Sequence, residues 1–139
     1  MSAEENKAIA RRYIELFNQG NLEGLDEVVA SDVVDHYHAP GAAPGLEGLK
    51  QTLGLLRRGF PDMYVTVEDI IAEGDTVMVR GTGRGTHKGE YMGISPTRKK
   101  VTLPVIAIYR IAKGKITDRW NLADGVGMMQ QLGAFAAAA

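Results

Sequence analysis

Residues 114–133 have the sequence GKITDRWNLADGVGMMQQLG, which predicts a strand followed by a short apolar helix. Side chains alternate between the two faces of a strand, so positions an even number apart share a face. This parity places Trp120 and Asp124 in one row with Ile116 and Leu122. A carboxylate at the end of an apolar row indicates a cavity. Burial there would raise the pKa of the carboxylic acid toward neutral pH, where it can act as an acid or a base.

The composition is that of an ordinary globular domain. A chain of 139 residues predicts one domain, 1–139, that is long enough to bury a core. The 16 basic and 17 acidic residues give no general reason to bind nucleic acid or an anionic membrane. The absence of cysteine excludes disulfides and thiolate chemistry. The N-terminus lacks the apolar core of a signal peptide, and no apolar run approaches the ~20 residues of a membrane span, so we expect a cytoplasmic protein.

Hydrophobic periodicity changes from helical to strand-like near residue 62. Apolar residues at helical spacing predict helices over 3–18, about 22–30, 46–58 and 125–132, and alternation predicts strands over 33–38, 64–71, 76–86, 101–111 and 115–123. Ser2 and Glu5 have the spacing of a capping box. Short glycine-containing turns indicate antiparallel neighbours. The order of elements predicts an α+β fold, with helices packed on one face of a curved sheet. The tail 134–139 is of low complexity.

Three glycines alternate along one predicted strand, at Gly81, Gly83 and Gly85. Glycine weakens a strand unless the sheet bends or another group approaches closely. This row predicts strong curvature, which would wrap the sheet into a half-open cone around a cavity.

The chain resembles the SnoaL-like polyketide cyclase group of the NTF2-like superfamily. The matching stretches are ARRYIELFNQGNLEGLDEVVASDVVDH (10–36), HKGEYMGISPTRKKV (87–101) and IYRIAKGKITDRWNLADGVGMMQQLG (108–133). They span nearly the whole chain in order and without large insertions. The resemblance implies an NTF2-like cone, with a curved antiparallel sheet and three N-terminal helices that enclose a pocket.

The resemblance also implies site residues. In characterised cyclases of the group, an aspartate on the last strand acts as acid and base in an intramolecular aldol ring closure. The Trp-x-x-x-Asp pattern matches that residue to Asp124, Tyr13 matches a pocket aromatic, and His36 falls where the group often has a polar pocket residue. The strand before the last, 101–111, has no histidine, whereas the cyclases usually carry one there.

The catalytic candidates are therefore Asp124 and His36, and each has a second interpretation. Asp124 could instead be the N-cap of the closing helix. His36 and His38 would project to the same side of a strand, but no third ligand is evident, and we predict no metal site. The predicted substrate-binding residues, chosen as pocket aromatics, wall, lid and filler side chains, are Tyr13, Phe17, His38, Phe60, His87, Tyr91, Trp120 and Met128.

The leading functional hypothesis is a small cofactor-independent enzyme of lyase or isomerase type with an apolar pocket. Asp124 would perform acid/base chemistry on a polyketide-like or other hydrophobic carbonyl substrate, as an aldol-type cyclase or isomerase. One alternative is a limonene-type epoxide hydrolase that uses Asp124 and Arg80, although the strand around Arg80 has no second aspartate. The other alternative is a non-catalytic module for small-molecule binding or dimerisation.

A homodimer is the expected assembly. The strand 101–111 is apolar on both faces, with Val105, Ala107 and Tyr109 on one and Ile106 and Ile108 on the other. One face can pack on the helices, and the other would be an exposed apolar patch without a partner.

Overall fold

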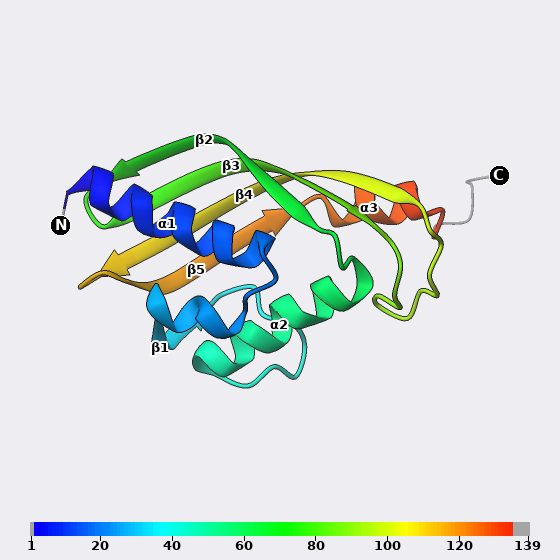
Figure 1. Cartoon of the computed structure of the whole chain (residues 1–139), viewed down its shortest axis with the longest axis horizontal. Helices are drawn as coiled ribbons and strands as arrows, with labels where there is room; N and C mark the ends of the chain where they lie inside the picture. The colour runs from blue at the N-terminus through cyan, green and yellow to red at the C-terminus, as the bar shows by residue number, and fades with distance from the viewer. Residues whose placement is uncertain (1, 135–139) are drawn as a thin grey trace.

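The computed structural model describes residues 2–134, so the rest of the predicted low-complexity tail, from residue 135 on, lies outside the described residues. The elements in chain order are α1 (Ala3–Asn18), the 3₁₀ helix η1 (Glu23–Glu27), β1 (Val29–Asp35), α2 (Gly45–Gly59), β2 (Tyr64–Glu73), β3 (Thr76–Thr86), β4 (Lys100–Ala112), β5 (Lys115–Ala123) and α3 (Gly125–Leu132). In Figure 1, α1 and α2 lie over one face of a curved sheet, and α3 closes one end. The predicted α+β architecture is confirmed.

The helix α1 begins and ends where the sequence predicts. Its capping box is present: the Ser2 hydroxyl accepts the Glu5 N–H at 3.0 Å, and the Glu5 carboxylate accepts the Ser2 N–H at 3.1 Å. Its buried face includes Ala10, Tyr13 and Phe17, at the three- and four-residue spacing of one helix side. This face packs against the sheet, so that Tyr13 and Phe17 point toward its centre.

The five strands form one sheet in the order β1-β5-β4-β3-β2. The strands β2 to β5 are antiparallel neighbours, as predicted, but β1 pairs with β5 in parallel, which the hairpin pattern did not indicate. The helix predicted over about 22–30 is wrong in extent, because only the η1 turn is helical and Val29 already starts β1. The strand predicted over 33–38 is likewise shifted, and β1 ends at Asp35, before both histidines.

A β-bulge in β5 reverses the predicted sidedness of this strand. Ile111 pairs with Ile116 while Arg110 pairs with Asp118, so Thr117 is the extra residue. An extra residue shifts the alternation by one, and side chains beyond it change face. The predicted common face of Ile116 and Trp120 is therefore wrong: Ile116 lies in the core, whereas Trp120 lies on the outer face of the sheet.

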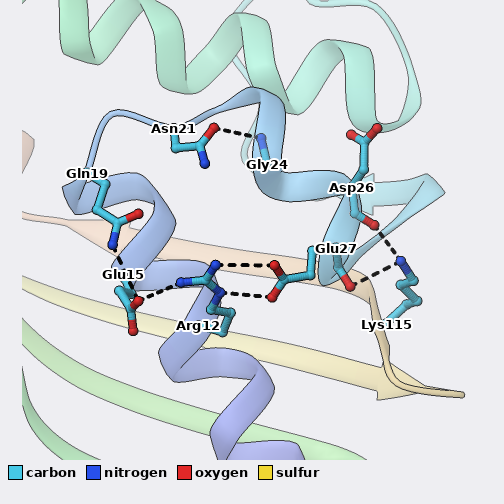
Figure 2. Close-up of polar contacts among 8 residues, drawn as sticks. All are labelled: Arg12, Glu15, Gln19, Asn21, Gly24, Asp26, Glu27 and Lys115. Atoms are coloured by element: carbon cyan, nitrogen blue, oxygen red, sulfur yellow. Dashed lines mark hydrogen bonds and ion pairs between the residues drawn. The ribbon is translucent and has the colours of Figure 1, made fainter.

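Exposed polar contacts hold η1 against the start of β5 and the middle of α1 (Figure 2). The Arg12 guanidinium donates to both carboxylate oxygens of Glu27, at 2.8 and 3.2 Å. The Lys115 ammonium donates to the backbone carbonyls of Asp26 and Glu27. Exposed ion pairs contribute little stability, but these contacts come from three elements and fix where β1 enters the sheet.

Candidate functional site

A cavity of about 240 Å³ lies between the inner face of the sheet and the helices α1 and α2. Its wall is mostly apolar, with tyrosines, one arginine, one asparagine and one threonine. The lining residues are Tyr13, Ile14, Phe17, Tyr37, Thr52, Leu53, Leu56, Met63, Val65, Val79, Gly81, Gly83, Tyr91, Leu103, Val105, Ala107, Tyr109, Arg119, Asn121, Ala123 and Met128. Small-molecule sites have this character, a concave apolar surface with a few polar groups.

A buried ion pair supplies the charge at this cavity. An Nη nitrogen of Arg119, on β5, donates to Oδ1 of Asp35, at the end of β1, over 2.9 Å. The Arg119 and Asp35 side chains are only 7% and 5% exposed. The parallel pairing of β1 with β5 brings the two residues together, because Asp35 and Arg119 are direct neighbours in that ladder. Arg119 also lines the cavity, which places a buried cation in a mostly apolar wall.

Two tyrosines complete this polar cluster, which consists of Tyr13, Asp35, Tyr109 and Arg119. The Tyr13 and Tyr109 rings are tilted against each other with centroids 5.2 Å apart. Among residues 2–134, Tyr13 Oη, Asp35 Oδ2 and Arg119 Nε are buried without a hydrogen-bond partner. Buried polar atoms are usually paired. Three such atoms in one cluster therefore indicate a place prepared for a polar ligand group.

The cluster holds neutral hydroxyls around a fixed cation. Burial raises the pKa of the Tyr13 hydroxyl, Asp35 raises it further, and Arg119 opposes both. Burial also raises the pKa of Tyr109. Burial opposes the charge on Arg119, but Tyr13, Asp35 and Tyr109 outweigh it, and the pKa of the guanidinium is raised. At neutral pH the site thus offers a guanidinium and hydroxyl donors, which can stabilise negative charge that develops on a substrate oxygen.

Four of the predicted site residues line the cavity: Tyr13 and Phe17 from α1, Tyr91 from the connection between β3 and β4, and Met128 from α3. The other six, Asp124, His36, His38, Phe60, His87 and Trp120, do not line it. Asp35, Arg119 and Tyr109 are not among the site residues predicted from the sequence. The parity rule, corrected for a bulge at Thr117, would have placed Arg119 on the inner face, but no local signal indicates that bulge.

Asp124 caps the helix α3. Its Oδ1 accepts the backbone N–H of Gly127 at 2.8 Å, and the residue is exposed. The alternative interpretation of this residue as an N-cap is confirmed. The preceding residue, Ala123, lines the cavity, so Asp124 follows directly after the wall. Its predicted acid/base role stays a prediction.

His36 and Trp120 meet on the outer face of the sheet. Their rings are stacked with centroids 4.3 Å apart and planes 5° from parallel. His36 Nε2 also lies 3.1 Å from Asp118 Oδ2. Burial opposes the charge on Asp118, but the bonds from His36 and Thr117 outweigh it and lower the pKa of this carboxyl. The placement removes both aromatic rings from the cavity, because the bulge turns Trp120 outward.

His38 and His87 also lie apart from the cavity. His38 follows the end of β1 and contacts the Ala39 carbonyl through Nδ1, at 2.9 Å. The predicted placement of His38 beside His36 on one strand is wrong, because the strand ends at Asp35. The side chain of His87, a predicted substrate-binding residue, is fully buried. Its Nδ1 accepts the backbone N–H of Thr97 at 3.1 Å.

Phe60 connects His87 to the cavity wall. It stacks on the His87 ring, with centroids 5.2 Å apart, and meets the Tyr91 ring edge-on at 5.4 Å. Phe60 is itself fully buried, so it supports Tyr91 from behind. The connection from His87 to Lys99 is further held to the end of α2, since the backbone N–H groups of Lys88 and Gly89 both donate to the Gly59 carbonyl.

The set of residues considered for epoxide hydrolysis is not assembled. Arg80 lies on the outer face of β3, where its Nε donates to Asp69 Oδ2 at 2.6 Å. Both side chains are exposed, and neither lines the cavity. Across residues 2–134 no group of three or more histidine, aspartate or glutamate side chains could hold a metal ion. Over the same residues, no helix is both long enough and apolar enough to cross a membrane.

The fold is that of an NTF2-like cone, and it encloses an internal cavity. Comparison with known proteins narrows this class: the family model of SnoaL-like polyketide cyclases matches residues 7–132, and the chain belongs to that family. The nogalonic acid methyl ester cyclase of Streptomyces nogalater is 28% identical over 122 residues, which cover 86% of this chain and 91% of that enzyme.

Solved structures agree with this assignment. IdmH from Streptomyces antibioticus is 36% identical and superimposes with a TM-score of 0.81, over 92% of this chain and 98% of that one. TsrD from Streptomyces laurentii superimposes with a TM-score of 0.88 over 97% of this chain and 99% of its own, at 23% identity, which shows the fold alone.

Proposed function

We propose that this chain catalyses an aldol-type cyclisation of a polyketide-like or other hydrophobic carbonyl substrate inside the cavity. The observation that carries the proposal is the buried guanidinium of Arg119 in a mostly apolar wall, with Tyr13 and Tyr109 in the same cluster. A fixed cation in a water-poor site stabilises an oxyanion far more than it would in water. Membership of a family whose relatives include a methyl ester cyclase supports the same chemistry.

The proposed reaction has two steps that use this geometry. A base removes the proton from a carbon next to a carbonyl, and the electron pair moves onto the carbonyl oxygen, where Arg119 holds the enolate. The enolate carbon then attacks a second carbonyl of the same chain, which forms the carbon–carbon bond and closes the ring. The new alkoxide takes back the proton from the conjugate acid of the base, so protons and electrons balance.

Asp35 and Asp124 compete for the role of the base. Asp35 contacts Arg119 directly and its Oδ2 has no partner among residues 2–134, but Asp35 does not itself line the cavity. Asp124 is the residue that the family resemblance selects, but its carboxylate is engaged by the Gly127 N–H. A base must come within about 2.6–3.2 Å of the proton that it removes, so variants at both positions are needed to assign the role.

A substrate panel tests the function and the roles together. Wild type is given β-keto esters, polyketide mimics and epoxides, and is compared with Arg119→Lys, Asp35→Asn and Asp124→Asn after each variant is shown to be folded. We expect ring closure by wild type and a loss in kcat of about 10²–10³-fold for Arg119→Lys, the effect of removing one well-placed oxyanion donor. Full activity in Arg119→Lys would contradict the proposal.

The remaining outcomes separate the alternatives. Loss of turnover in Asp124→Asn but not in Asp35→Asn would assign the acid/base role to Asp124. Turnover of epoxides alone would make the chain a hydrolase. Tight binding of a hydrophobic ligand without any turnover would identify a binding module and refute the enzymatic proposal.

We also propose that the chain forms a homodimer through the outer face of the sheet. Ile106 and Leu122 are 47% and 60% exposed on this face, beside Trp120 and Arg110, and large exposed apolar patches usually mark interaction sites. Sedimentation at increasing concentration should show a dimer, and Ile106→Glu should shift it to monomer. A wild-type monomer at high concentration would refute this assembly.

A further inference from the structure

One glycine in the cavity wall has neighbours that leave room for a larger residue. The inner face of β3 presents Gly81, Gly83 and Gly85 in a row, and the first two of these line the cavity. None of the three has the positive φ that would require glycine. The reason for each glycine must therefore be sought in what a side chain would meet at that position.

Two of the three are explained by close neighbours. A Cβ on Gly81 would lie 3.0 Å from the Thr66 carbonyl oxygen, which belongs to the backbone of β2 and cannot move aside cheaply. A Cβ on Gly85 would lie 3.2–3.3 Å from Met63 and Phe60, which pack tightly beneath this end of the strand. Packing alone accounts for glycine at both positions.

Gly83 is different, because a Cβ there would make only ordinary contacts. It would lie 3.5 Å from Met63 Sδ, 3.7 Å from Val105 Cγ2 and 4.0 Å from the Leu103 carbonyl oxygen. Glycine in the interior of a strand is less stable than alanine, because it loses more conformational freedom and offers no side chain to pack. The fold would therefore accept alanine at this position and gain stability from it.

We propose that Gly83 is a specificity-determining residue, whose missing side chain leaves room for a flat apolar ring of the substrate to lie against β3. The neighbours of this position support a ring there. Across the adjacent strands Gly83 pairs with Val65 and Leu103, and these two also line the cavity. Together Val65, Gly83 and Leu103 form an apolar surface, here called the shelf, with the glycine at its centre.

The inference rests on the proposed function only in naming the occupant as the substrate. Three members of the polar cluster, Tyr13, Tyr109 and Arg119, line the same cavity as Gly83. A flat carbonyl compound can therefore place a ring on the shelf and an oxygen toward Arg119. A side chain at position 83 should then weaken the binding of broad, fused ring systems, whereas a single ring should still fit.

Binding of two probes of different breadth tests the proposal without any need for turnover. The probes are 1,8-dihydroxyanthraquinone, with three fused rings, and 4-hydroxyacetophenone, with one ring, each titrated by calorimetry into the full chain. We expect wild type to bind both. Gly83→Val should weaken binding of the three-ring probe by at least about tenfold, the effect of added methyl groups in a close-fitting apolar pocket, and change the one-ring probe by less than about threefold. Gly83→Ala should lie between the two.

Thermal unfolding provides the control for folding. Gly83→Ala should raise Tm by roughly 2–4 °C, since alanine is the better strand residue and the site has room for its methyl group. The matched control is Gly54→Ala on α2, where a Cβ meets nothing within 4 Å and which does not line the cavity. This variant should raise Tm in the same way and leave the affinity for both probes unchanged.

Several results would overturn the proposal. They are unchanged three-ring binding in a folded Gly83→Val, an equal loss for both probes, a lowered Tm in Gly83→Ala, and failure of wild type to bind either probe. Failure of the proposed function gives a different result: the probes bind with the expected dependence on residue 83, but no substrate in the panel is turned over.

Discussion

Replacing Arg119 by methionine should be the most destabilising single change at the site. The substitution keeps an apolar stem but removes the cation from Asp35, whose carboxylate is 2.9 Å away and only 5% exposed. Removing one partner of such a buried pair costs about 3–5 kcal/mol, because the other charge is left without compensation. In urea unfolding followed by circular dichroism, with a typical slope of about 2 kcal/mol/M, the midpoint should fall by roughly 1.5–2.5 M.

A double variant distinguishes the lost ion pair from lost packing. In Asp35→Leu/Arg119→Met no charge remains buried, so the free energy of unfolding should recover to within about 1–2 kcal/mol of wild type. Each single variant should be less stable than the double variant. The reasoning is refuted if Arg119→Met unfolds within about 1 kcal/mol of wild type, or if the two single effects simply add in the double variant.

Three further predictions concern residues around the cavity. Burial raises the pKa of Tyr13 and of Tyr109, so the stability that comes from keeping them neutral is complete below their unfolded pKa of about 10 and is lost as pH rises further. Urea unfolding between pH 8 and 11 should show this decline in the free energy of unfolding, and Tyr13→Phe should reduce it. The same dependence on pH in Tyr13→Phe as in wild type would contradict the assignment. Asp124→Ala should cost about 0.5–2 kcal/mol through loss of the helix cap, and Asp124→Ser should restore most of it in the same unfolding assay; equal stability of wild type and the alanine variant would show that the cap contributes nothing. His87→Leu leaves the Thr97 N–H without its acceptor and should lower the free energy of unfolding by about 1–3 kcal/mol, with faster hydrogen exchange at the Thr97 amide. His87→Asn offers an oxygen near the same place, so its Thr97 amide should exchange more slowly than in the leucine variant. The reverse order of exchange rates would count against this hydrogen bond.

Local patterns were sufficient to predict most elements. The bounds of α1 follow from its capping box and its apolar spacing, and β3 to β5 follow from their β-branched and apolar stretches and the turns between them. The resemblance to SnoaL-like cyclases was confirmed by the family match. The least accurate region was 22–38, where a 3₁₀ turn and a strand without clear alternation replace the predicted helix and strand.

The candidate site was predicted only in part. Tyr13, Phe17, Tyr91 and Met128 line the cavity. Tyr13, Phe17 and Met128 lie on the apolar faces of helices, which point inward whatever the details of strand pairing. Trp120 was assigned to the wrong face, because one extra residue in β5 shifts the alternation and nothing near Thr117 in the sequence indicates it. The bulge appears only in the pairing of the β4–β5 hairpin, where Ile111 faces Ile116 and Arg110 faces Asp118.

The sequence by itself thus determined the class of fold, the family and the apolar character of the pocket, because periodicity, caps and turns act over a few residues. Only the tertiary structure determined the polar centre of the site. Asp35 and Arg119 are 84 residues apart, and they meet because β1 joins β5 in parallel. The ion pair, the bulge that turns Arg119 inward and the room above Gly83 all depend on how separate strands pair, and that information is spread over the whole chain.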